Sequence, residues 1–323
     1  MGCLMLVSIL IPCFNGTQWV SQAIESALAQ TWSDKEVIVV DDGSTDTSLE
    51  QIRRFGDRIR WETQSNQGSN PTRNRLLTLA RGSWLQYLDA DDYLLPNKIK
   101  LQAEVLGGRE EADIIYGPVT LEFATEQPVR RELLRIPEPR DPWVLLARWY
   151  LPQTGAPLWR KQAVVDAGGW TPTQPACQEH ELYLRLLMSG KKFVYSDANG
   201  AIYRQWSEET LWKKDKPRTR QLRLEIENQM EEFLRSRGEL TVERQWAINM
   251  ARFEMARLAW QHDRNAAVQI IARVHASMPE FMPAGRAAPR LYGQLYRWFG
   301  FTAAEKLAAW SRPVRSIGGG AAA

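Results

Sequence analysis

The stretch WLQYLDADDYLLP, which runs from Trp84 to Pro96, joins an apolar, β-prone run to three acidic residues within four positions. The apolar run predicts a strand, and Pro96 predicts its end. Carboxylates this close repel one another and raise each other's pKa, so a cation normally compensates them. Because Mg²⁺ is typically held by a carboxylate or two plus substrate phosphates, the stretch indicates a metal-bound diphosphate. The alternative interpretation is an acidic turn that merely follows a strand.

Two further apolar runs predict buried strands upstream. Leu6–Ile11 and Glu36–Val40 are nearly continuous and rich in β-branched residues, which is typical of strands covered on both faces of a parallel sheet. Each run ends in turn residues, Pro12–Gly16 after the first and Asp41–Ser44 after the second. Ligands of such sheets lie beyond the carboxyl ends of the strands, so we expect these turns and Asp89–Asp92 to converge on one site.

Helical periodicity between the strands completes the pattern. A helix is expected over residues 18–29, Thr47 and Glu50 match a capping box, and a helix over 73–80 should follow the polar loop 64–71. This alternation predicts an α/β domain with a mostly parallel sheet flanked by helices. The other expected elements are strands at 59–62, 112–117, 119–123, 157–160 and a final pair over 195–203, helices at 143–150, 162–167 and from 178 onward, and a mobile excursion over 125–142.

The composition fits a globular protein. The chain has 323 residues, of which 44% are hydrophobic and 24% charged, and this is enough for a sizeable core. A net charge of +3 is too small to indicate a nucleic-acid partner, and none is expected. Fourteen Trp residues suit a protein that binds planar ligands or sugars, although Trp also fills cores.

The cysteines and the N-terminal run indicate the compartment. Cys3, Cys13 and Cys177 are odd in number and show no C-x-x-C spacing, so we interpret them as reduced thiols. The three His residues are too scattered for a zinc site. The apolar run at 3–14 is too short for a transmembrane helix and lacks the basic start of a signal peptide. We therefore expect a cytoplasmic protein that contacts a membrane only from outside, if at all.

Several motifs together resemble one enzyme family. No G-x-G-x-x-G follows the first strand and no G-x-x-x-x-G-K-[ST] occurs, which disfavours dehydrogenases and P-loop enzymes. The segments SILIPCFN (8–15), VVDDGSTD (39–46) and LDADD (88–92) instead resemble the family 2 glycosyltransferases of the GT-A fold. Arg73-Asn74, the Gly-Gly-Trp turn at 168–170 and CQEHELYLR (177–185) also match, in order, over roughly residues 5–205. The resemblance implies a GT-A nucleotide-sugar-binding and catalytic domain over residues 1–207.

The resemblance also implies a nucleotide site. Asp42, the second acid of its motif, would hydrogen-bond the base of the donor, whereas Asp41 would shape the loop. Arg73 would help to hold the nucleotide, and Asp91 would hold the ribose. The implied nucleotide-binding set is completed by Pro12, Phe14 and Asn15. Two departures from the family pattern, Cys13 and the run Asn70-Pro71-Thr72, would alter nucleotide preference without touching the metal residues.

The metal and the general base are likewise implied by the resemblance. Asp92 would hold Mg²⁺ or Mn²⁺ with Asp91 as a second ligand, and Asp89 would join through water or orient the turn. Glu179 would be the general base. The pair Gln178-Glu179 stands where many relatives have Glu-Asp, and Gln178 would support the site. The alternative for Glu179 is a carboxylate that only stabilises a helix N-terminus.

A helical region is expected over residues 208–317, followed by a disordered tail at 318–323. Apolar residues recur at helical spacing from Leu222 onward. From Phe281 on, the only acid is Glu305 and Thr302 is its expected capping partner, whereas basic and aromatic residues alternate. The basic residues are Arg286, Arg290, Arg297, Lys306, Arg312 and Arg315, and the aromatic ones are Tyr292, Tyr296, Trp298, Phe299, Phe301 and Trp310. Two hypotheses remain open: peripheral contact with the anionic inner face of the cell membrane, or packing on the protein or in a homodimer.

These observations favour an inverting, metal-dependent glycosyltransferase. It would move a sugar from a nucleotide-diphosphate donor, most simply a UDP-sugar, to a hydroxyl of a saccharide or lipid-linked saccharide during surface polysaccharide or glycoconjugate assembly. Two alternatives are kept. One is a non-catalytic sugar-binding or assembly subunit, which the acids at 91, 92 and 179 disfavour. The other is a sugar-phosphate nucleotidyltransferase, which the missing Gly-rich phosphate loop disfavours.

Overall fold

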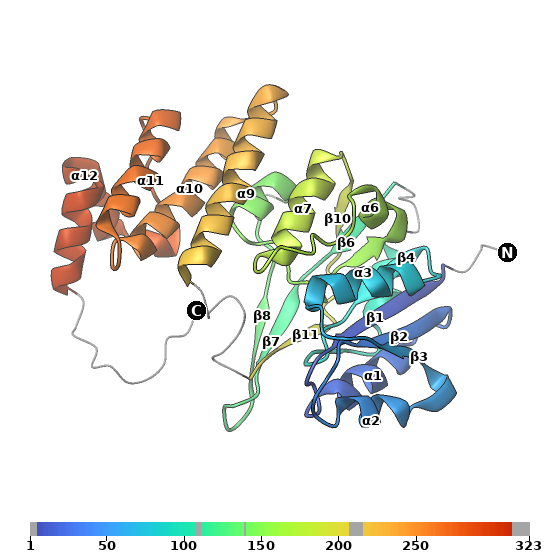
Figure 1. Ribbon diagram of the computed structural model, residues 1–323. Coiled ribbons are helices and arrows are strands. Elements are labelled where there is room, and N and C mark those ends of the chain that lie inside the picture. Colours follow the sequence, from blue (N-terminus) through green and yellow to red (C-terminus); the bar gives the residue numbers. More distant parts are fainter. Residues whose placement is uncertain (1–4, 107–110, 139, 207–215, 312–323) are drawn as a thin grey trace. The chain divides into compact units, whose positions relative to one another are not determined.

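A computed structural model describes residues 5–106, 111–138, 140–206 and 216–311 (Figure 1). The chain divides into two compact units, residues 1–226 and 227–323. The first unit carries the sheets, and the described part of the second is helical (Figure 1). The boundary expected after residue 207 and the tail expected at 318–323 lie outside the described residues.

A seven-stranded, mostly parallel sheet forms the centre of the described part of the first unit. Four neighbouring pairs are parallel, and only β9 runs antiparallel to both of its neighbours. In spatial order the strands are β10 (Phe193–Tyr195), β6 (Ile114–Tyr116), β9 (Leu158–Arg160), β4 (Trp84–Tyr87), β1 (Val7–Cys13), β2 (Lys35–Asp41) and β3 (Arg60–Thr63). The expected mostly parallel sheet is therefore confirmed.

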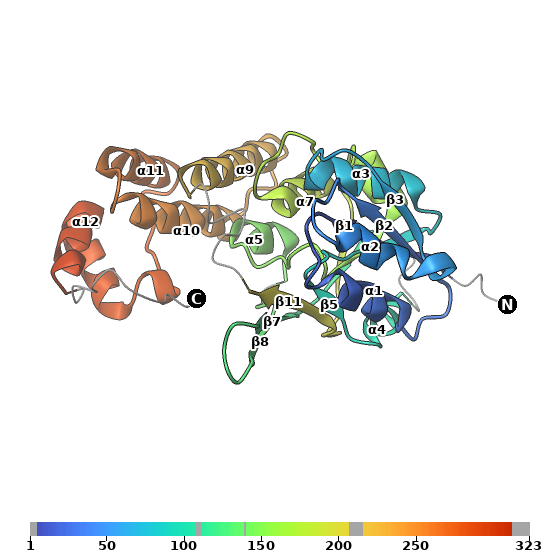
Figure 2. The ribbon, with the colours of Figure 1, turned by 60° about the horizontal axis from the view of Figure 1, so that its bottom comes forward.

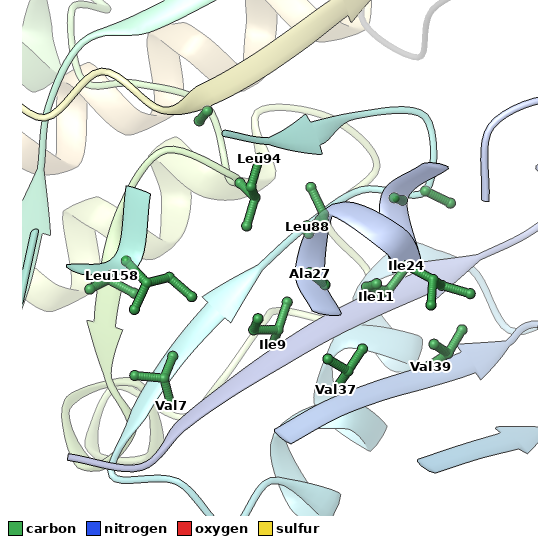
Figure 3. Packing of buried hydrophobic residues seen from close by; sticks show 14 of the residues in the cluster. Val7, Ile9, Ile11, Ile24, Ala27, Val37, Val39, Leu88, Leu94 and Leu158 are labelled. Carbon is green, nitrogen blue, oxygen red and sulfur yellow. The ribbon is translucent and has the colours of Figure 1, made fainter. Parts of the chain in front are cut away.

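Helices cover this sheet on both faces, with α1 and α2 on one side and α3 on the other (Figure 1). Alternate residues of β1, such as Val7, Ile9 and Ile11, pack with Ile24 and Ala27 of α1 (Figure 3). The residues between them are buried as well, so both faces of β1 are covered as predicted. The helices are α1 (Val20–Leu28), α2 (Ser48–Arg53), α3 (Ser69–Leu79), α4 (Lys98–Glu104), α5 (Pro142–Ala147), α6 (Lys161–Asp166) and α7 (Gln178–Met188), with a short 3-10 turn at Gly56–Arg58.

Two helix starts differ from the sequence predictions. The α3 helix begins at Ser69 rather than near Arg73, and Pro71 fits because the first turn of a helix needs no backbone N–H from it. The expected capping box at Thr47 does not form, since its side chain makes no capping hydrogen bond. The carboxylate of Asp46 instead accepts the backbone N–H of Ser48 at 2.9 Å.

A second, four-stranded sheet lies beside the acidic turn (Figure 2). Its strands, in spatial order, are β5 (Tyr93–Leu94), β11 (Ala201–Gln205), β7 (Val119–Phe123) and β8 (Arg130–Leu134). Because β11 pairs with β5 immediately after the turn at 89–92, the end of β11 is delivered to the acids of that turn.

This second sheet corrects two expectations. The predicted mobile excursion over 125–142 contains β8, which pairs with β7 and is supported by an Arg131–Glu122 ion pair at 2.8 Å. The predicted final strand pair over 195–203 is also wrong. The strand β10 pairs with β6 in the large sheet, whereas β11 pairs with β5 and β7 in the small one.

The second unit packs its helices around an aromatic core. The helices are α9 (Lys216–Ser236, which crosses the division between the units), α10 (Val242–Ala259), α11 (Arg264–Ser277) and α12 (Arg290–Ser311), with a 3-10 turn at Gly285–Ala287. The ring of Phe253 has four aromatic neighbours with centroids 5.6–6.2 Å away, namely Phe281, Tyr292, Tyr296 and Phe301. No helix in the described part is long and apolar enough to span a bilayer.

Polar residues are also buried in this unit. Arg252 and Glu231 form an ion pair at 2.5 Å, and their side chains are 0% and 3% exposed. Glu305 does not cap a helix with Thr302 as expected, because it is buried, pairs with Arg257 and accepts the hydroxyl of Tyr292 at 2.8 Å. These ion pairs connect α10 to α9 and to α12.

Candidate active site

The acidic turn follows β4 and places two of its acids under the end of β11. Asp92 is buried, and its Oδ1 accepts the backbone N–H of Arg204 at 2.8 Å. Asp91 is half-buried, and its Oδ2 accepts the indole N–H of Trp206 at 2.9 Å. Burial, and then the charges of neighbouring acids, raise the pKa of both carboxyls, for Asp92 well above the ordinary range. Such a site favours a bound cation, because a cation relieves the repulsion.

Arg204 is one of two cations that the structure brings to this turn. Its guanidinium donates to the backbone carbonyl of Asp91 and, at 2.7 Å, to Oε1 of Gln22. It also stacks over Trp19, 3.9 Å from the ring centroid. The sequence analysis missed Arg204 and Trp206. The sequence does contain a signal for both residues. They stand two positions apart at the end of the last strand, and residues two apart lie on one face of a strand.

Arg73 connects the acidic turn to α7. This buried side chain donates from Nη2 to Oδ1 of Asp89 at 2.8 Å and from Nη1 to Oε1 of Gln178 at 2.7 Å. Its guanidinium lies over Trp170, 4.8 Å from the ring centroid. Its Nε has no hydrogen-bond partner in the described part of the chain. Arg73 therefore connects the acidic turn to Gln178, a residue 105 positions after Arg73 in the sequence.

Glu179 lies in the first turn of α7, directly after the residue that Arg73 contacts. The helix follows Cys177, whose backbone is left-handed with φ of 59°. Glu179 is half-buried, and burial raises the pKa of its carboxyl above the ordinary range. The charge of Arg73 acts in the opposite direction and lowers it. A carboxylate with a raised pKa is a stronger base, which suits proton abstraction.

The neighbours of Glu179 are less suited to proton transfer. His180 is buried and stacks on Trp149 at a centroid distance of 3.8 Å. Burial, and then the charge of Arg223, lower the pKa of His180 to about 3. Glu181 forms an ion pair with Arg185 at 2.6 Å. Of these three residues, Glu179 keeps a carboxylate near the acidic turn.

The residues after β1 and β2 form a separate hydrogen-bonded group. Asp42 is buried, and its two carboxylate oxygens accept the backbone N–H groups of Gln67 at 3.0 Å and Gly68 at 2.8 Å. A third bond, at 2.7 Å, comes from the side chain of Gln64. Asp42 thus anchors the loop that leads into α3. To hydrogen-bond a nucleotide base, the carboxylate of Asp42 would have to accept a further hydrogen bond or give up one of these three.

The other predicted nucleotide residues lie at the same edge of the sheet. Asp41 accepts the hydroxyl of Thr63 at 2.9 Å and is paired in register with Cys13. Oδ1 of Asn15 accepts the backbone N–H of Thr45 at 2.8 Å, which fastens the two turns together. Pro12 lies within β1, one residue before the strand ends at Cys13, and Phe14 is 51% exposed. An exposed aromatic ring at this edge is available for stacking on a ligand.

The carboxyls of the acidic turn are candidate ligands for a metal ion. Among the described residues, no group of three or more His, Cys, Asp or Glu side chains is arranged to hold an ion. The adjacent carboxyls of Asp91 and Asp92 nevertheless fit Mg²⁺ or Mn²⁺, because such ions are commonly bound by a carboxylate or two plus substrate phosphates. Burial and the charges of neighbouring acids raise the pKa values of both carboxyls, and a bound cation would offset this. Oxygen atoms of a ligand would have to complete the coordination.

Comparison with curated sequences identifies relatives of the N-terminal part. Residues 8–162 match the family model for glycosyl transferase family 2. An uncharacterized glycosyltransferase from Rickettsia conorii is 41% identical over 115 residues, covering 35% of this chain and 19% of the relative. Chondroitin synthase from Escherichia coli is 39% identical over 99 residues, covering 30% of this chain and 14% of the relative. The chain therefore spans only a small part of the length of these relatives.

Solved structures resemble a larger share of the chain. S. aureus TarS, solved with UDP-GlcNAc, superposes with a TM-score of 0.60 at 14% identity and covers 96% of this chain and 93% of that one. The mannosyltransferase PcManGT from Pyrobaculum calidifontis, solved with GDP-Man and Mn²⁺, has a TM-score of 0.53 at 14% identity and covers 97% and 89%. At this identity the likeness shows the fold. Together with the family match, it shows that residues 8–162 belong to a glycosyl transferase family 2 domain of the GT-A fold.

Proposed function

We propose that the protein is an inverting glycosyltransferase that moves a sugar from a nucleotide-diphosphate donor to an acceptor hydroxyl. One observation carries the proposal. Arg73 holds Asp89 at 2.8 Å and Gln178 at 2.7 Å, so the acidic turn and the first turn of α7 belong to one constellation. The acids that would hold the diphosphate of the donor and the carboxylate that would take the proton of the acceptor would then face one site, where the two substrates meet.

In this mechanism the donor lies over the carboxyl ends of β1, β2 and β4. Asp92, with Asp91, would hold Mg²⁺ or Mn²⁺, which would neutralise the negative charge of the departing nucleoside diphosphate. Asp91 would also hold the ribose. Arg73 keeps the turn in place through Asp89.

Glu179 would be the general base. Its carboxylate would accept the proton of the acceptor hydroxyl while the hydroxyl oxygen attacks the anomeric carbon, and the bond to the diphosphate breaks on the opposite face. A single displacement of this kind inverts the configuration at the anomeric carbon. The raised pKa of Glu179 supports the role, because burial makes the carboxylate more basic.

The relatives support the donor and acceptor classes that we propose. TarS is solved with UDP and with UDP-GlcNAc, and PcManGT with GDP-Man and Mn²⁺. A UDP-sugar donor is our first proposal and a GDP-sugar the second. The likeness to chondroitin synthase supports a saccharide or lipid-linked saccharide acceptor in the assembly of surface polysaccharides or glycoconjugates. Reduced thiols and the absence of C-x-x-C spacing support work in the cytoplasm.

The experiment combines binding with transfer. Purified protein is screened by thermal shift against UDP- and GDP-sugars with Mn²⁺ and with EDTA, since a ligand at 100 times its Kd stabilises by about 2.7 kcal/mol. The best donor is then used with Glu179→Gln, which should keep donor binding but lose about 10²–10⁴-fold in transfer. Glu181→Gln, two residues along the same helix, is the matched control and should retain transfer. Near wild-type transfer by Glu179→Gln would reject the assigned base, and full transfer in EDTA would reject the metal.

A further inference from the structure

The α12 helix of the second unit has one buried and one exposed aromatic face. Tyr292, Tyr296 and Phe301 are at most 6% exposed and pack around Phe253 in the core. Leu291 and Trp298, by contrast, are 71% and 76% exposed. The packing hypothesis therefore holds for the first set of aromatic residues but leaves the second set without a partner within the described residues.

Three exposed apolar residues lie along one side of the helix before Gly300. Leu291 and Trp298 are seven positions apart, which is two helical turns, so they lie on the same face. Phe299 is next to Trp298 and is 65% exposed. Gly300 has φ of 74° and interrupts the helix directly after Phe299, so both rings stand at the end of a helical segment. We call Leu291, Trp298 and Phe299 the apolar edge of α12.

Exposed cations lie close to this edge in the sequence. Arg290 and Arg297 are exposed, are also seven positions apart, and each directly precedes a residue of the edge. Arg286 and Lys306 are exposed nearby in the sequence. The only acid between residues 281 and 311 is Glu305, which is 1% exposed and bound to Arg257 and Tyr292. Four exposed cations thus accompany the apolar edge with no exposed acid among them.

We propose that the apolar edge of α12 and its four cations dock the second unit on an anionic lipid surface. Indole and phenyl rings partition into the headgroup region of a bilayer, and Arg and Lys meet lipid phosphates there. The occupant is a lipid surface rather than a second copy of the chain for an electrostatic reason. A two-fold dimer would place the same patch against itself and bring the cations of both copies together.

The test is co-sedimentation with vesicles of phosphatidylcholine alone or mixed with phosphatidylserine, at low and high salt. The test variant is the double substitution Trp298→Ser/Phe299→Ser. The control is Val242→Ser, which removes an equally exposed apolar side chain, 79% exposed, from α10 of the same unit. Point substitutions are preferred to truncation, because removing α12 would also remove Tyr292 and Tyr296 from the core.

The wild type and the control should pellet with anionic vesicles at low salt and be released as salt screens the charges. The double variant should lose at least about tenfold in the ratio of bound to free protein. Equal pelleting of the double variant and the wild type, or no pelleting of the wild type with anionic vesicles at low salt, would overturn the proposal. If the wild type dimerises, the double variant does not, and the wild type fails to bind vesicles, the apolar edge would instead be assigned to contact with a second copy. Nucleotide binding should be the same in all three proteins, so failure here leaves the proposed transfer activity untouched.

Discussion

Trp206→Phe should strengthen the binding of a nucleoside diphosphate. The indole N–H of Trp206 donates to Oδ2 of Asp91 at 2.9 Å, and the same carboxylate is proposed to hold the ribose and to assist the metal. In the donor-free protein the indole therefore occupies an oxygen that the ligand needs. Phenylalanine keeps an aromatic ring beside Trp19, whose ring centroid is 6.4 Å away, but removes the competing donor.

The magnitude follows from the strength of this hydrogen bond. A hydrogen bond to a charged group contributes about 1.5–3 kcal/mol. Trp206 is 41% exposed, so water weakens the bond and the lower end of that range applies. About 1.5 kcal/mol corresponds to roughly a tenfold decrease in Kd. The ligand-free variant should also be less stable than the wild type by a similar amount, because nothing replaces the lost bond.

The measurement is calorimetric titration with UDP and Mn²⁺, accompanied by thermal unfolding without ligand. Trp61→Phe, in β3 beside Arg53, is a control for replacing a Trp in the same unit. An unchanged or weaker affinity in Trp206→Phe would refute the competition between indole and ligand. Asp91→Asn separates the remaining cases. If Asp91→Asn weakens UDP binding and Trp206→Phe leaves it unchanged, Asp91 binds the ligand without releasing the indole. If neither substitution changes UDP binding, Asp91 has no role in the nucleotide site.

Three further predictions concern the buried acids. Asp92→Asn should abolish transfer and weaken UDP binding with Mn²⁺ but hardly in EDTA, which titrations in both buffers would show; equal loss in EDTA would contradict a metal role. On the acidic side of the pH–rate profile, the transfer rate should fall at a pH above the ordinary pKa of a glutamate, because burial raises the pKa of Glu179. A rate that stays constant through the pH range above that ordinary pKa would contradict the role of Glu179 as the base. Arg252→Met should destabilise the second unit by about 3–5 kcal/mol in urea unfolding at pH 7, because it leaves the buried Glu231 without its closest partner. The ion pair with Arg252 holds the pKa of Glu231 down to about 2, so the stability that the pair contributes is present above the ordinary glutamate pKa and is lost as the pH falls toward 2. If Arg252→Met destabilises the unit by the same amount at pH 3 as at pH 7, that result would argue against the pair.

Much of the first unit could be predicted from local patterns. The strands β1 and β2 were recognisable because parallel strands buried on both faces require nearly continuous apolar runs. The motif around Asp91 and Asp92 was equally visible, since three acids within four positions directly follow an apolar run. The error over 125–142 arose because β8 is largely exposed and charged, so its alternation gave no apolar signal.

The sequence by itself determined the class of the fold and the position of the acidic turn, because hydrophobic periodicity and turn chemistry act between near neighbours in the chain. Only the tertiary structure decided that Arg73 holds both Asp89 and Gln178, and that Arg204 and Trp206 cover the acids from β11. It likewise divided the aromatic residues of α12 into a buried and an exposed set. These pairings depend on which strands and helices become neighbours, and contacts that span 100 or more residues leave no periodic trace in a single sequence.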